Sequence, residues 1–347
     1  MNTAVISSFC AQTEPGQLFP AELERFHRIE LYVFMRETAE LLLRSAEFPL
    51  TYTPDKTALD LLSEAADPDN RPTNGKKPAE AVADVIAVQL GNRKVVAFAT
   101  YLPEISRHSE ACIEKAKRAL QFLVRIARML HEKHHHPIRV IEIVGGSKVD
   151  GVWYGETGSE SEFIVNRLPM KAAVDRLLNN LEEVAVEAAK PTSIALALEL
   201  EPGPLFTIGG KKSLAYLCEQ ISRHPMPEVR STIGLNLDVP HWAFLSDITP
   251  AWINGRPLIK DRICNAHICD HFSAGHFGDV PPPSFRDESE FKIWLRFLSE
   301  HFRSETGDHG LPYSQSVSCE LECLRNTDQV MEAFTTLETW RREVELD

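Results

Sequence analysis

The chain has 347 residues, a length that fits two domains of average size or one barrel domain with additions. Hydrophobic residues make up 43% and charged residues 25% of it, which excludes a disordered chain, a collagen-like repeat and a small disulfide-stapled protein. The 37 lysines and arginines against 50 aspartates and glutamates give a net charge of −13, so a nucleic acid is a poor expected partner.

The cysteines and the amino terminus indicate the compartment. The seven cysteines are scattered and form no C-x-x-C pair, so neither a disulfide framework nor a zinc ribbon is expected. The first segment, MNTAVISSFCAQTEPGQ, lacks the basic flank and long apolar run of a signal peptide. No stretch reaches the roughly 18 apolar residues that a membrane span requires. We therefore predict a cytoplasmic protein with no membrane partner.

The amino-terminal part, residues 1–93, is the hardest to assign. It predicts one helix from Pro20 to about Ala46 and another from Pro78 to Leu90. Turn formers and charges fill 66–78, which we expect to form an exposed loop. Two short apolar segments are candidates for the first strand of the fold: Thr3–Ser8 and Ile29–Phe34.

From Lys94 onward, short apolar segments alternate with amphipathic ones, as in parallel strands separated by helices. The predicted strands are Val95–Tyr101, Ile138–Val144, Ile194–Glu201, Thr232–Asp238, Ile263–Asp270 and Ser316–Glu322. The predicted helices are Ile113–Leu130, Met170–Ala189, Lys212–Arg223, Glu288–Arg303 and Thr327–Glu343. The histidine run at 134–136 is expected at the surface, near a helix carboxyl end. These elements make at least six β-α units in a single domain, 1–347.

Four of these strands have two unlike faces, because alternate side chains point to opposite sides. One face is branched and apolar, and the other is small and becomes polar toward the carboxyl end. The polar faces end, in chain order, in Glu199 and Glu201, in Asp238, in His267, and in Glu320 and Glu322. An open doubly wound sheet needs apolar residues on both faces. A closed (β/α)8 barrel explains the asymmetry, because its outer face meets helices and its inner face ends in a polar rim.

Three carboxylates and an imidazole gathered at one rim point to a metal ion. They repel one another unless a cation neutralises them. Oxygen ligands with a single imidazole suit manganese, magnesium, cobalt or zinc, and no thiolate decides among the four. The rim therefore predicts one divalent metal ion.

Four sequence blocks carry a resemblance to a known family. They are LALELEPG at Leu196–Gly203, LNLDVPHWAF at Leu235–Phe244, NAHICDHFSAGHFGD at Asn265–Asp279 and SVSCELE at Ser316–Glu322. In this order the chain resembles the xylose isomerase-like TIM-barrel superfamily, which includes sugar phosphate isomerases and epimerases, inosose dehydratase and endonuclease IV. The resemblance covers 95–325. It implies an α/β fold, a (β/α)8 TIM-type barrel, here with an extended and partly helical amino-terminal region.

The resemblance also implies roles for particular residues. The implied metal ligands are Glu199, Asp238, His267 and Glu320. A slip of two residues would put Glu201 in place of Glu199 and Glu322 in place of Glu320, and this alternative stays open. Two further residues are implied to face the substrate: His241 and His276.

For such a site the resemblance implies a divalent-metal-dependent isomerase or epimerase of a sugar or related hydroxy-carbonyl compound. A proton would move through a metal-stabilised enediolate, with Glu199 and Glu320 as the catalytic base and acid. A dehydratase of an inosose-like substrate, a phosphodiesterase of the endonuclease IV type and a non-catalytic small-molecule-binding barrel are the alternatives. The expected partner is a sugar-like small molecule involved in carbohydrate metabolism, and a homo-oligomer is left open.

Overall fold

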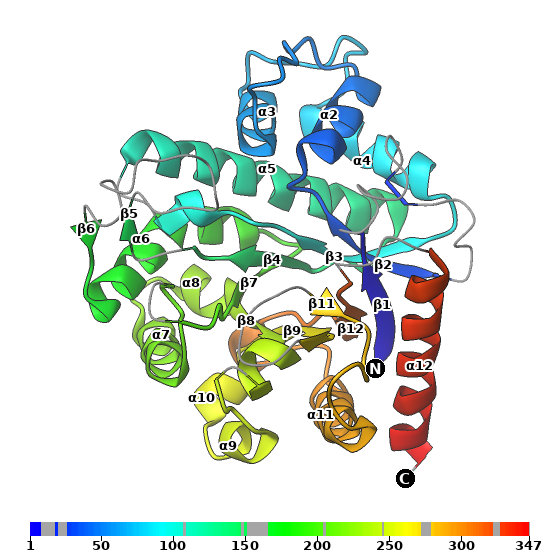
Figure 1. The fold of residues 1–347 in the computed structure, drawn as a ribbon. Coiled ribbons are helices and arrows are strands. Elements are labelled where there is room, and N and C mark those ends of the chain that lie inside the picture. Colours follow the sequence, from blue (N-terminus) through cyan, green and yellow to red (C-terminus); the bar gives the residue numbers. More distant parts are fainter. Residues whose placement is uncertain are drawn as a thin grey trace.

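Eight parallel strands close into a barrel at the centre of the molecule (Figure 1). In chain order they are β1 (Asn2–Ile6), β2 (Arg28–Tyr32), β3 (Lys94–Ala99), β4 (Val140–Val144), β7 (Ala195–Glu199), β8 (Ile233–Asp238), β9 (Ile263–Ile268) and β12 (Ser316–Cys319). Strand β1 completes the ring by pairing with both β2 and β12. The prediction of a (β/α)8 barrel is confirmed.

The computed structural model describes residues 1–7, 18–19, 26–106, 109–146, 149–150, 166–203, 206–244, 246–271, 279–321 and 327–346. Two small hairpins lie outside the barrel sheet. They are formed by β5 (Val149–Asp150) with β6 (Asn166–Arg167), and by β10 (Asp270–His271) with β11 (Asp279–Val280).

Helices surround the barrel, and those predicted after Lys94 are confirmed. They are α5 (Glu110–His134), α6 (Met170–Ala188), α7 (Lys211–Arg223), α11 (Glu288–His301) and α12 (Thr327–Leu346). Shorter helices are α8 (Pro227–Thr232), α9 (Pro250–Asn254) and α10 (Pro257–Lys260), with helical turns η2 (Pro103–Ser106), η4 (Pro240–Phe244) and η5 (Asp308–Gly310). In α6, Val174, Leu177 and Leu181 recur at helical spacing and are fully buried. No described helix combines the length and the apolar content needed to cross a membrane.

The amino-terminal part supplies two barrel strands. A helix is predicted from Pro20 to Ala46, but Arg28–Tyr32 forms β2, and α2 begins only at Arg36 (Arg36–Ser45). The prediction is wrong there because Ile29 and Leu31 are buried at a period of two, which is the spacing of a strand. Both candidate first-strand segments contain strands, and β1 comes first.

Three helices are inserted between β2 and β3. After α2 come α3 (Ala58–Ala65), which begins with a capping box between Thr57 and Asp60, and α4 (Pro78–Leu90). Helix α3 packs on α5 from outside, so the insertion adds a further layer over one side of the barrel (Figure 1). Residues 66–77 between α3 and α4 form turns and are mostly exposed.

The interior of the barrel is polar, although branched apolar side chains usually fill such barrels. Glu30 on β2 is fully buried. Its carboxylate accepts hydrogen bonds from Asn265 Nδ2 on β9, at 3.1 Å, and from Ser318 Oγ on β12, at 2.5 Å. Strand β2 is not a neighbour of β9 or β12 in the sheet, so these contacts cross the inside of the barrel. The polar interior continues upward to the mouth, where the predicted site residues lie.

His136 is buried, contrary to the surface position predicted for the histidine run. Its side chain is 3% exposed, and its Nδ1 accepts a hydrogen bond of 2.9 Å from the Val95 N–H in β3. The surface prediction holds for His135, which is exposed. Burial, together with the charges of Lys94 and His134, lowers the pKa of His136 to about 4.

The neutral His136 makes the stability of the fold depend on pH. The unfolded chain binds a proton at the ordinary pKa of 6.5, and the folded chain only near 4, so unfolding takes up a proton between these values. This contribution is complete above pH 6.5 and declines as the pH falls toward 4, by about 3 kcal/mol at most. In His136→Asn an amide oxygen that does not titrate can accept the Val95 N–H. Urea denaturation should show a smaller loss of unfolding free energy between pH 7 and 4.5 in this variant than in the wild type; equal losses would contradict the assignment.

Candidate metal centre

The four predicted metal ligands lie on neighbouring strands at one end of the barrel. Glu199 and Asp238 are the last residues of β7 and β8, His267 lies near the end of β9, and Glu320 directly follows β12. These strands are consecutive in the barrel, in the order β12-β9-β8-β7. Asp238 is paired directly with His267 in the sheet. The carboxyl ends of the strands therefore bring the four residues to one sector of the mouth.

Glu199 lies between two imidazoles. Its Oε1 is 2.9 Å from His241 Nδ1, and its Oε2 is 3.8 Å from His267 Nδ1. Oε2 also accepts a hydrogen bond of 2.7 Å from Asn236 Nδ2. The side chain is buried. Burial raises the pKa of Glu199, but the hydrogen bond and charge of His241 and the charge of His267 outweigh burial and lower it.

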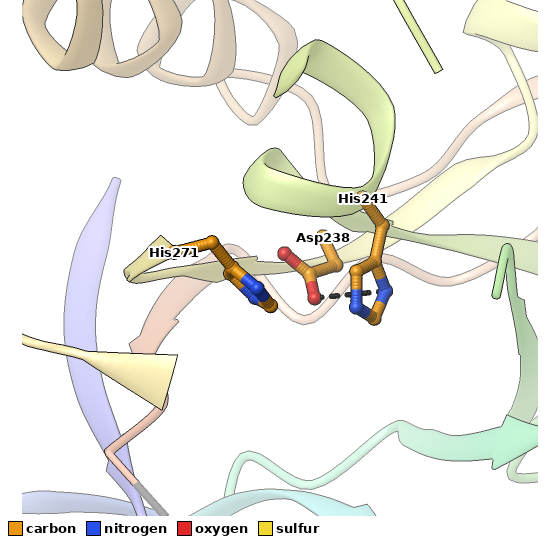
Figure 2. A group of neighbouring side chains, drawn as sticks. All are labelled: Asp238, His241 and His271. Atoms are coloured by element: carbon orange, nitrogen blue, oxygen red, sulfur yellow. Dashed lines mark ion pairs between the residues drawn. The ribbon is translucent and has the colours of Figure 1, made fainter. Parts of the chain in front are cut away.

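His241 joins Glu199 to Asp238. The helical turn η4 follows β8 directly and brings His241 back toward the residue three positions earlier, so that its Nδ1 lies 3.0 Å from Asp238 Oδ2 (Figure 2). Burial lowers the pKa of His241, but the negative charges of Asp238, Glu201 and Glu199 raise it well above 6.5. One imidazole thus neutralises several acidic groups.

His267 is held on both ring nitrogens. Its Nδ1 lies 3.2 Å from Glu320 Oε2, and its Nε2 lies 3.1 Å from Glu30 Oε1. Burial lowers the pKa of His267, but the charges of Glu30 and Glu320 and their hydrogen bonds raise it well above 6.5. Because Glu30 occupies Nε2, Nδ1 is the nitrogen that faces the two rim carboxylates, Glu199 and Glu320.

Glu30 and His271 are the site residues that sequence reasoning misses. The signal for Glu30 is present, since the alternation in β2 places it opposite the buried Ile29 and Leu31. His271, on β10, has no comparable pattern, because it follows the barrel strand β9 outside the sheet.

Two groups of three residues have ligand atoms within 4.8 Å of one another in the described part of the chain. One is Asp238, His241 and His271, and the other is Glu199, Glu201 and His241. Neither group includes His267 or Glu320, which contact one another on the other side of Glu199. Since Glu199 and Glu201 share a group, the geometry does not separate these two alternatives. His276 and Glu322 lie outside the described residues.

The donor set of this site fits a divalent cation. Each of the two imidazoles lies within 4 Å of two or more carboxylates, and all of these side chains are largely removed from solvent. Buried acids placed so closely are stabilised by positive charge, which here comes from protonated imidazoles. Neutral imidazole and carboxylate are ligands for divalent ions, so a cation can replace those protons.

Known structures share this architecture. The chain aligns over 99% of its length with an IolI protein that binds a zinc atom, at 14% identity and a TM-score of 0.59 over 98% of that chain. It aligns equally completely with a D-tagatose 3-epimerase-like protein (12%, 0.58, 98% of that chain) and with endonuclease IV from Thermus thermophilus (12%, 0.53, 98% of that chain). The chain has the fold of the xylose isomerase-like TIM barrels. At these identities the likeness concerns the fold alone. The chain matches no family model and no curated protein sequence.

Glu142 is a second carboxyl group buried in the strands below Glu199. It lies on β4, where its Oε2 accepts a hydrogen bond of 2.8 Å from the Thr100 N–H. Burial and the nearby charge of Glu199 raise the pKa of Glu142 well above 4.5, so this group is neutral at neutral pH. Among the described residues no hydrogen bond joins it to His267, which makes it a matched control for Glu30.

We expect Glu30→Gln to weaken the binding of Co²⁺ or Mn²⁺ at the mouth. A carboxylate that accepts the second N–H of a ligand histidine fixes the ring and raises its basicity, and its loss typically reduces metal affinity 10–100-fold. Isothermal titration calorimetry should show a reduction of roughly this size in Glu30→Gln, and wild-type affinity in Glu142→Gln. Wild-type affinity in Glu30→Gln, or an equal loss in both variants, would show that Glu30 does not orient His267 for a metal.

Proposed function

We propose that the protein is a divalent-metal-dependent isomerase or epimerase of a sugar or a related hydroxy-carbonyl compound. The observation that carries this proposal is the approach of two carboxylates from separate strands to the same atom. Glu199 Oε2 and Glu320 Oε2 lie 3.8 and 3.2 Å from His267 Nδ1. Two carboxylates that flank one point can remove a proton from a substrate carbon and return one to it.

Four residues would hold the cation: Glu199, Asp238, His267 and Glu320. When bound, the cation supplies a positive centre that stabilises the negative charge developing on neighbouring oxygens of a hydroxy-carbonyl substrate. The zinc of the IolI protein and the name of the D-tagatose 3-epimerase-like protein agree with this chemistry in barrels of the same fold. Manganese, magnesium, cobalt and zinc all suit the ligand set.

The proton steps follow from the charges of the two glutamates. The lowered pKa of Glu199 keeps it anionic at neutral pH, so it is suited to take the proton from the carbon next to the carbonyl group. The C–H electron pair moves into the substrate, which becomes an enediolate. Glu320 then donates a proton to a carbon of that enediolate, and the two roles exchange in the reverse reaction. Return of a proton to the adjacent carbon gives isomerisation, and return to the opposite face of the same carbon gives epimerisation.

A nuclease activity of the endonuclease IV type is less well supported. Such a centre needs further histidines at earlier strand ends, but β3 and β4 are followed here by Thr100-Tyr101 and Gly145-Gly146. The net charge of −13 also repels a phosphate backbone. The shared fold with endonuclease IV does not outweigh these two observations.

Exchange of substrate hydrogen with solvent tests the proposal directly. Ketoses and inososes are incubated in D₂O with protein stripped of metal by a chelator and then reloaded with each of the four ions, and deuterium at the carbon next to the carbonyl is followed by NMR. We expect exchange only in the reloaded protein. At saturating metal, Glu320→Gln should reduce kcat about 10²–10⁴-fold, whereas Glu290→Gln, an exposed glutamate of α11, should not change it.

Three outcomes would contradict the proposal. Full turnover by metal-loaded Glu320→Gln would refute the two-carboxylate scheme. Tight binding of a sugar without exchange would favour a non-catalytic barrel. Metal-dependent nicking of abasic DNA would favour a nuclease.

A further inference from the structure

We propose that the mouth of the barrel binds a second divalent cation, held by Asp238, His241 and His271. This goes beyond the proposed function, with which it shares only Asp238, and it does not require isomerase chemistry. The cation is one that imidazole favours, such as Zn²⁺ or Co²⁺.

The three side chains converge from three different elements. Asp238 ends β8, His241 lies in the turn η4, and His271 lies on β10. One ligand atom from each lies within 4.8 Å of the other two, and His241 Nδ1 is 3.0 Å from Asp238 Oδ2. The imidazole rings have their centroids 5.6 Å apart, and Figure 2 shows the Asp238 carboxylate between them. All three residues are at most 2% exposed.

The backbone of His271 is fixed on both sides. Its N–H donates to Asp270 Oδ1 at 2.8 Å, and its carbonyl accepts a hydrogen bond of 2.7 Å from Arg286 Nη1. Asp270 is itself fully buried, pairs with the Arg286 guanidinium at 2.6 Å and accepts the N–H groups of Ser284, Phe285 and Arg286. A ligand held on such a rigid frame loses little conformational entropy on binding a metal.

The donor set selects the type of cation. Magnesium and calcium take oxygen ligands, whereas two imidazoles and one carboxylate are a ligand set of zinc sites that keep a position open for water or substrate. The competing group, Glu199 with Glu201 and His241, contains only one imidazole. His241 Nδ1 lies between Glu199 and Asp238, so a single ion can use it, and the second imidazole of His271 favours the Asp238 side.

The two proposed ions would share Asp238. A carboxylate with two oxygens can bridge two cations, and paired ions stabilise charge on two oxygens of one substrate. In this arrangement His241 and His271 bind the second ion, while His267, Glu199 and Glu320 remain with the first. Glu201, which belongs to the same group as Glu199 and His241, adds negative charge beside the pair.

Metal stoichiometry tests the second site without reference to activity. Chelator-stripped full-length protein is loaded with Zn²⁺, freed of excess ion by gel filtration and analysed by mass spectrometry of the metal, with affinities from calorimetry. We expect two equivalents in the wild type, one in His271→Gln, one in His267→Gln and none in the double variant. His135→Gln, which changes an exposed histidine, should keep two. Thermal denaturation confirms that each variant is folded, and a variant that is not folded is replaced by the corresponding alanine substitution.

The outcomes separate the two proposals. One equivalent in the wild type that His271→Gln leaves unchanged would overturn the second site. Solvent exchange of substrate hydrogen by that protein would then leave the proposed function standing. Two equivalents in the wild type and one in His271→Gln, with no exchange of any substrate, would support the second site and count against the isomerase.

Discussion

Glu199 is a carboxylate buried at the end of a barrel strand, and its charge has to be neutralised within a few ångströms. Removing an ion from water costs several kcal/mol even after the protein relaxes, unless an opposite charge lies close by. Here an imidazole approaches each carboxylate oxygen of Glu199. Those imidazoles in turn contact Asp238 on one side and Glu320 on the other, so acidic and basic groups alternate across the mouth. A cation that replaced the imidazole protons would meet the same need, and for that reason this sector suits a metal.

The closed barrel is what makes this alternation possible. Glu30 and His267 are 237 positions apart in the chain, yet their side chains meet because β2 and β9 face one another across the barrel interior. Asn265 and Ser318 donate to the same carboxylate, so it is anchored from β9 and β12. The polar interior therefore has a purpose that an apolar one would not serve: it orients His267 from below.

The sequence predicts much of this architecture, because strand and helix periodicity is local. The asymmetry of the strand faces is enough to place Glu199, Asp238 and His267 at one rim, and the spacing Asp-x-x-His is enough to single out His241. The prediction fails where partners are distant. The pairing of Glu30 with His267 depends on ring closure, and His271 is oriented by contacts of Asp270 with a segment 14 to 16 residues away. His136 looks like a surface residue until the Val95 N–H is found beside it.

Anomalous diffraction from crystals of the protein loaded with Co²⁺, recorded above and below the cobalt absorption edge, tests the central claim most directly. We predict an anomalous peak bounded by the side chains of Glu199, Asp238, His267 and Glu320, with about 2.0–2.2 Å between the ion and its oxygen and nitrogen ligands. An ion-free mouth in crystals that bind cobalt elsewhere, or side chains of these four residues that point to separate regions, would contradict it.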